Sequence, residues 1–234
     1  MPNRRSACDT GGVTGWDDAL QLADWRRLVA ELYADVRRIA ASDPAAAHAH
    51  WADAREVLYR EHPQSPVPPG SRARFRARHF PYDPALRFEV PLRAPDSRPQ
   101  GAPRAGAGVE PVGSPVGMAR DAVGRPFTRI GRLDIPFASG THHLALYWLH
   151  EYSGGLFLPF VDATAGRGTY GGGRYVLDTA KGADLGPGRA PGTLVIDFNF
   201  AYQPSCAFDP RWECPLAPPE NRLDVPVPAG ERLE

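Results

Sequence analysis

The sequence predicts a mainly β protein with an N-terminal α-helical hairpin. Apolar residues recur with the helical period of about 3.6 residues up to residue 61, and with a period of about two from residue 80 onward. In the second region, turns that contain glycine separate short strand candidates, and no helical pattern lies between them. This arrangement is typical of antiparallel sheets, so we expect an antiparallel β-sandwich or a partly open barrel.

Two helices are expected, over residues 17–41 and 44–61. Asp43 suits the N-cap of the second helix and Pro44 its first position, and the prolines of residues 62–70 end it. Neither apolar stripe can be buried within the hairpin alone, so we expect the hairpin to pack on the β domain. The stripes consist of Leu22, Trp25, Leu28, Val29, Leu32, Val36 and Ile39, and of Ala47, Trp51, Ala54, Val57 and Leu58.

The domain organisation follows from the same pattern. Residues 1–15 are expected to be a disordered N-terminus, residues 16–70 the helical hairpin, and residues 80–234 one antiparallel β domain. Residues 94–115 are rich in proline, glycine and alanine, which predicts a flexible insertion in that domain. Strands are expected at residues 86–92, 127–137, 142–150, 156–161, 170–177, 193–198 and 223–227.

Composition argues against several classes of protein. The formal net charge is zero, which gives no electrostatic reason to expect binding to nucleic acid or to an anionic membrane. The apolar stretches are strand-sized, well below the ~20 residues of a membrane span. The first residues lack the apolar run of a secretory signal, and three cysteines are too few for a disulfide scaffold. We therefore expect a cytoplasmic protein without a cofactor, of undetermined oligomeric state.

Two patterns that resemble known sites are interpreted as structural. Gly166, Gly168 and Gly171 match the spacing of a dinucleotide-binding loop, but a strand pattern follows where a helix is required, so a glycine-rich hairpin is expected. Cys206 and Cys214 do not have the spacing of a zinc knuckle. A disulfide and a pair of free thiols both stay open for them.

The histidines are not expected to bind a metal. Those at or after the second helix point in different directions or follow its end, and those beside the strand at residues 142–150 are too far apart or on opposite faces. All are expected on the surface or in structural roles. They are His48, His50, His62, His142, His143 and His150.

The candidate site is a dense set of polar residues in the C-terminal third. On residues 193–200 a period of two places Asp197 and Asn199 on a polar face, beside an apolar one; such a face is either a pocket wall or a solvent face. Arg174 can make a bidentate pair with Asp162 or Asp197. Polar groups that converge in this way line ligand sites. The candidate ligand-binding residues are Asp162, Thr164, Tyr170, Arg174, Asp197, Asn199, Tyr202 and Asn221.

The first hypothesis for this set is binding of a small polar or anionic ligand. Its hydrogen-bond donors would be Arg174, Tyr170, Asn199 and Tyr202. If Arg174 were buried and fully paired, away from any cavity, this hypothesis would lose its main donor.

Two other hypotheses belong to different classes. A hydrolase-type enzyme would use Asp162 or Asp197 as a general base or metal ligand, or Cys206 as a nucleophile. A structural or partner-binding module would need no small ligand. Its polar residues would hold irregular segments, with Asn221 bonded to backbone groups that lack a strand partner.

The order of several short motifs indicates a family. With them the chain resembles the bacterial family called domain of unknown function 1684, over most of its length outside the first residues and the insertion. That family has no established activity, so the resemblance implies where a site lies rather than which chemistry it performs. The motifs are IGRL at residues 130–133, FxDxT at 160–164, TYGxGRY at 169–175, DFNxAY at 197–202, P-x-C-A at 204–207, CPLxPPENRL at 214–223 and AGE at 229–231.

Overall fold

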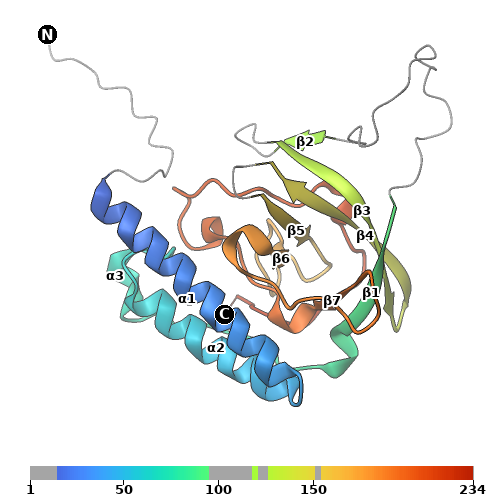
Figure 1. Cartoon of the computed structure of the whole chain (residues 1–234). Helices are drawn as coiled ribbons and strands as arrows, with labels where there is room; N and C mark the ends of the chain where they lie inside the picture. The colour runs from blue at the N-terminus through green and yellow to red at the C-terminus, as the bar shows by residue number, and fades with distance from the viewer. Residues whose placement is uncertain (1–14, 95–117, 121–125, 151–153, 234) are drawn as a thin grey trace, which may run out of the picture.

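In the computed structural model of the chain, residues 15–94, 118–120, 126–150 and 154–233 are described (Figure 1). The expected disordered N-terminus at residues 1–15 and the expected flexible insertion at residues 94–115 lie outside these ranges, except for residues 15 and 94.

The N-terminal helices form a hairpin that lies along one side of the sheet (Figure 1). Helix α1 spans Trp16–Ala40 and α2 spans Pro44–Glu61. The side chain of Asp43 accepts a hydrogen bond from the backbone N–H of Ala46 (3.0 Å), so Asp43 is the N-cap that the sequence predicted. A short helix, α3 (Pro69–Arg72), follows in the proline-rich segment.

The buried face of α2 is more polar than expected. Trp51 is buried, as predicted, but Val57 is 54% exposed and does not belong to this face. His48, Arg55 and Tyr59 take buried positions on the same stripe as Trp51. The prediction was wrong here because it counted only apolar side chains as candidates for burial.

Two of the histidines expected at the surface are buried. His48 packs against the ring of Trp51 (5.8 Å between ring centroids), and His62 packs against Trp25 (5.3 Å). Contacts with aromatic rings therefore replace hydration at both side chains. His50 is exposed, as expected.

The β region is a single antiparallel sheet in the order β6-β5-β4-β3-β1-β7, with β2 paired to β3. The sheet curls, and the chain after β7 returns to β6, where Tyr175 and Tyr202 form a bridge (Figure 1). The result is the partly open barrel rather than the two-sheet sandwich, and the mainly β fold class is confirmed. The strands are β1 (Arg87–Arg93), β2 (Met118–Arg120), β3 (Pro126–Phe137), β4 (Gly140–Leu149), β5 (Gly155–Phe160), β6 (Arg174–Asp178) and β7 (Thr193–Asp197).

Apolar residues form two cores, one on each face of the sheet. Inside the curl, Leu144 and Leu146 of β4 pack in one cluster with Val227 from near the C-terminus. On the outer face, Tyr147 of β4 belongs to a second cluster that includes Trp51 of α2. Successive residues of β4 thus pack into different cores, because side chains along a strand point alternately to the two faces of the sheet.

The last predicted strand, at residues 223–227, does not form. Pro226 and Pro228 have no N–H to donate to a ladder, so this stretch cannot pair as a regular strand. It is tied to the sheet instead by an isolated parallel bridge between Val161 and Arg222. We call residues 218–233 the C-terminal segment.

Candidate functional site

Arg174, the main expected donor, is enclosed by the protein. It lies at the start of β6, and its Nη2 donates to Oδ1 of Asp162 (3.1 Å). The same guanidinium donates to the backbone carbonyls of Val227 (2.9 Å), Glu231 (3.1 Å) and Ala229. All three carbonyls belong to the C-terminal segment, so Arg174 fastens this segment to β6.

Both carboxylate oxygens of Asp162 also accept hydrogen bonds within the protein. Its Oδ2 accepts hydrogen bonds from the backbone N–H (3.2 Å) and the hydroxyl (2.7 Å) of Thr164, and from the N–H of Val227 (2.8 Å). Burial lowers the pKa of Arg174, and the charge of Asp162 opposes this effect. The expected roles of Arg174 as a ligand donor and of Asp162 as a general base are therefore replaced by structural ones.

Asp197 and Asn199 do not form an open polar face, because β7 ends at Asp197 and the 3₁₀ turn Phe198–Phe200 follows. The amide of Asn199 donates to Asp197 (2.8 Å) and to the carbonyl of Asp83 (2.8 Å), and it accepts from the N–H of Asp83 (2.9 Å). Arg87 pairs with Asp197 at 3.2 Å. Burial raises the pKa of Asp197. Both side chains are fully buried, so the interpretation as a pocket wall was wrong.

Asn221 fills a gap in the sheet. The pairing of β4 with β5 runs from Leu149 to Tyr147, and Pro159 further along β5 has no N–H to continue it. The side chain of Asn221 accepts from the N–H of Ala145 (2.7 Å) and donates to the carbonyls of Ala145 (2.9 Å) and Pro159 (2.7 Å). This confirms the structural alternative for Asn221, which bonds to backbone groups without a strand partner.

The remaining candidate residues lie in other surroundings. Tyr202 is buried and donates to Asp178 (3.2 Å), and burial raises its pKa well above the usual value. Tyr170 is half-buried, with its hydroxyl 3.7 Å from Sγ of Cys206. The eight predicted residues are thus distributed over several local networks and do not converge on one cavity.

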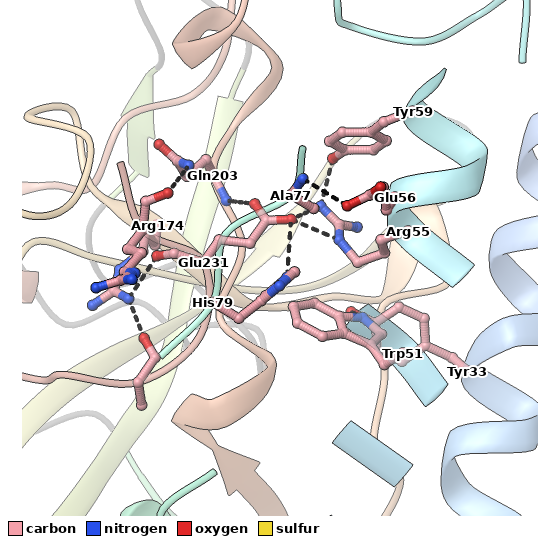
Figure 2. A network of polar contacts seen from close by, with 12 residues as sticks. Tyr33, Trp51, Arg55, Glu56, Tyr59, Ala77, His79, Arg174, Gln203 and Glu231 are labelled. Carbon is pink, nitrogen blue, oxygen red and sulfur yellow. Dashed lines mark hydrogen bonds and ion pairs between the residues drawn. The ribbon is translucent and has the colours of Figure 1, made fainter. Parts of the chain in front are cut away.

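Another buried ion pair joins Arg55 of α2 to Glu231 of the C-terminal segment (Figure 2). Nε and Nη2 of Arg55 each lie 2.8 Å from Oε1 of Glu231, and Oε2 accepts from the backbone N–H of Gln203 (2.7 Å). Nε2 of His79 lies 4.0 Å from the same carboxylate. This pair connects the helical hairpin to the end of the chain.

Aromatic rings surround the Arg55 guanidinium. Its central carbon lies 5.0 Å from the ring of Trp51, 4.7 Å from that of Tyr59 and 4.8 Å from that of Tyr202. Burial alone would lower the pKa of Arg55, but the charge of Glu231, the neighbouring Tyr59 and Tyr33, and the hydrogen bond to Glu231 together outweigh this effect, so the pKa is raised. Arg55 therefore keeps its charge in the folded protein.

A pocket of about 420 Å³ opens beside this ion pair. It lies between α3, the chain that follows α3, and the end of the C-terminal segment. Apolar side chains such as Phe75, Phe208 and Leu233 line part of it, and Gln203 and Glu231 lie at its inner side. The other lining residues include four arginines, so we call it the arginine pocket: Arg74, Arg76, Arg78 and Arg232.

Most of these arginines have no acidic partner. Arg76 lies 3.9 Å from Glu56, but within the described ranges no ion pair joins Arg74, Arg78 or Arg232 to a carboxylate. The N–H of Arg232 donates to the carbonyl of Arg78 (2.9 Å), so these two residues come from paired extended segments. Like charges on adjacent extended chains repel each other.

Sequence reasoning missed the arginine pocket and Arg55. The stretch RARFRARH at residues 72–79 alternates arginine with smaller or apolar residues, which in an extended chain puts Arg74, Arg76 and Arg78 on one side. That signal was available. Arg55 could have been found as the polar member of a stripe that continues from Trp51 to Tyr59.

Neither a metal site nor a membrane span is found in the part of the chain that the structure describes. No group of three or more His, Cys, Asp or Glu side chains there is arranged to hold a metal ion. The helices within the same ranges are too short or too polar to cross a membrane.

The fold and the site define a class of protein: a partly open β-barrel capped by a helical hairpin, with buried ion pairs that fasten the C-terminal segment. The family model described as "Protein of unknown function (DUF1684)" matches residues 75–232, and the chain belongs to this family. The resemblance seen in the sequence motifs is thereby confirmed.

One solved structure supports the fold. The chain is similar to an uncharacterised protein of Haloarcula marismortui, known from a solution NMR structure, with 28% identity and a TM-score of 0.53. The match covers 78% of this chain and 90% of that one. A comparison with curated proteins gave no match. Function therefore has to be argued from the site.

Proposed function

We propose that this protein binds a small molecule with a phosphate or carboxylate group in the arginine pocket. The observation that carries the proposal is that Arg74, Arg78 and Arg232 line one pocket and have no acidic partner in the described ranges. This keeps the expectation of a small anionic ligand but moves it away from Arg174.

Electrostatics favour an anion at this place. Arg78 and Arg232 lie on paired extended segments, where like charges repel each other and a nearby anion would reduce the repulsion. A guanidinium presents its N–H groups as a planar fork that matches the oxygens of a phosphate or carboxylate. Binding an anion would therefore replace a repulsion with charged hydrogen bonds.

The size and lining of the pocket limit the class of ligand. Its volume of about 420 Å³ lies within the ~300–1,000 Å³ of small-molecule sites. Phe75, Phe208 and Leu233 offer apolar surface beside the arginines. A ligand with an apolar body and an anionic end matches this combination better than a free inorganic ion does.

A hydrolase-type activity has no comparable support. A general base needs a carboxylate oxygen that can reach the substrate. Glu231 lines the arginine pocket, but its oxygens already accept hydrogen bonds from Arg55 and Gln203. Asp162 and Asp197 are buried and paired. Binding is therefore the function that we propose.

We also propose that the protein acts in the cytoplasm. The support for this proposal is that Cys206 and Cys214 are neighbours and both are free thiols, as is usual in a reducing compartment.

The proposal is tested by measuring the melting temperature at low ionic strength with inorganic phosphate, and with phosphorylated and carboxylated metabolites that have an apolar part. A ligand that binds the native state raises the melting temperature, and more so at higher concentration. We expect the amphipathic anions to raise it further than inorganic phosphate does. Calorimetric titration then gives the affinity of the best compound.

Matched variants test whether the ligand binds in the arginine pocket. Arg78→Gln and Arg232→Gln are each expected to weaken binding by about tenfold or more, because each removes a charged hydrogen-bond donor. Arg38→Gln makes the same change in the last turn of α1, outside the pocket lining, and is expected to leave the affinity unchanged. If no anion stabilises the protein, or if the three variants bind alike, the proposal is wrong.

A further inference from the structure

Cys206 and Cys214 lie side by side although eight positions separate them in the chain. Cys206 belongs to a 3₁₀ turn (Ser205–Ala207), and its backbone N–H donates to Sγ of Cys214 at 3.3 Å. Both are free thiols, and both side chains are half-buried. A small reagent can therefore reach two thiols that are already adjacent.

The surroundings make the two sulfurs unequal. The Cys206 side chain and the Cys206 backbone N–H both donate hydrogen bonds to the Cys214 sulfur, and the Lys181 ammonium adds a positive charge. These donors lower the pKa of Cys214. The adjacent Cys214 sulfur and burial raise the pKa of Cys206, even though the Tyr170 hydroxyl lies 3.7 Å from its Sγ. A thiolate is consequently favoured at Cys214.

We propose that Cys206 and Cys214 are a reversible redox pair, which a hydroperoxide oxidises to an intramolecular disulfide with Cys214 as the attacking sulfur. The thiolate, not the thiol, is the nucleophile in this chemistry, and a neighbouring second thiol is the typical partner that resolves the first product. Both requirements are met here: hydrogen-bond donors surround the Cys214 sulfur, and the Cys206 sulfur lies beside it.

The reaction balances with hydrogen peroxide as the oxidant. The Cys214 thiolate attacks one peroxide oxygen, the O–O bond breaks, and the released hydroxide takes up a proton to form water, leaving a sulfenic acid on Cys214. The Cys206 sulfur then attacks the Cys214 sulfur, the S–S bond forms, and the hydroxyl leaves as a second water with the Cys206 proton. A dithiol reductant reverses the process by thiol–disulfide exchange.

The test uses the full chain with Cys8→Ser, which leaves the described pair as its only cysteines. The folded protein is treated with hydrogen peroxide, its free thiols are alkylated, and its intact mass is measured. We expect a species that is about 2 Da lighter and resists alkylation at both cysteines, and that dithiothreitol returns to the dithiol form. Circular dichroism establishes that the chain stays folded during oxidation.

One variant and one labelling experiment distinguish the roles of the sulfurs. With Cys206→Ser, oxidation should stop at a sulfenic acid on Cys214, which dimedone traps. In the Cys8→Ser chain, where both thiols are present, a limiting amount of iodoacetamide should label Cys214 at least about tenfold faster than Cys206, because the thiolate is favoured at Cys214. The proposal is overturned if the folded Cys8→Ser chain forms no disulfide, or if its two cysteines are labelled at the same rate.

Discussion

Replacing Glu231 with glutamine tests how much the buried ion pair contributes to stability. Glu231→Gln keeps the shape of the side chain and removes its charge. Arg55 would then stay buried, with a side-chain exposure of 5%, among three aromatic rings and without a counter-charge. The amide must also turn a donor toward either Arg55 or the N–H of Gln203, both of which are donors themselves.

The expected loss is large for a single substitution. Breaking a buried ion pair by removing one partner costs about 3–5 kcal/mol, because the other charge is left without compensation. For a domain of this size, that corresponds to a fall in melting temperature of roughly 6–20 °C. Urea denaturation followed by circular dichroism measures the free energy of unfolding directly, and urea does not screen charges as guanidinium chloride does.

Two companion variants make this result decisive. Asp35→Asn is the same chemical change in the exposed pair of Asp35 with Arg38, and it should have little effect. The double variant Arg55→Met with Glu231→Leu should be more stable than Glu231→Gln alone, because no unpaired charge is left inside. A loss below about 1 kcal/mol for Glu231→Gln would refute the reasoning, since it would mean that water or another group already compensates Arg55.

Three further predictions concern other buried groups. Burial, with a smaller contribution from the nearby His79, lowers the pKa of His48 from 6.5 to about 4, so the unfolded state binds this proton more tightly than the folded state does. Stability from this group should be complete above pH ~6.5 and fall by about 3 kcal/mol as the pH drops to ~4, and His48→Phe should flatten this part of a urea-denaturation pH profile. Asn221→Ala should reduce the free energy of unfolding by about 3 kcal/mol, because it leaves buried backbone groups of β4 and β5 without partners, whereas a loss within about 0.5 kcal/mol would contradict that role. Gly230→Ala should be destabilising in thermal denaturation, because Gly230 has φ 73° and an added Cβ would lie 2.3 Å from the carbonyl oxygen of Ala201; an unchanged melting temperature would count against this.

Much of the fold could be predicted from the sequence, because it depends on local patterns. The N-cap Asp43, the change of apolar period near residue 80 and the glycine turns each report a local backbone preference. The strand predicted at residues 223–227 was wrong, because there a local pattern was misleading. Its apolar alternation resembles a strand, but Pro226 and Pro228 remove the donors that a ladder requires.

The candidate site was predicted less well, because its geometry depends on contacts between distant residues. Arg174 was expected to pair with Asp162 or Asp197, and the structure selects Asp162. The partners of Arg174 at residues 227–231 could not be inferred from spacing, since they lie more than fifty positions away. Arg55 and Glu231, separated by 176 positions, could be paired only once the fold was known.

The density of polar residues that first suggested an active site has a structural cause. The C-terminal segment is rich in proline and forms no regular strand, so some of its carbonyl and N–H groups find their partners in side chains. Arg174 and Asp162 supply such partners, the side chain of Asn221 ties the segment to β4 and β5, and the Arg55–Glu231 pair fixes the end of the segment. Hydrogen bonds within the protein thus account for the burial of Asp162, Arg174 and Asn221 without any ligand. They do not explain Arg74, Arg78 and Arg232, which are exposed and have no acidic partner in the described ranges. Their convergence on one pocket with apolar walls gives a reason to look for an anion there.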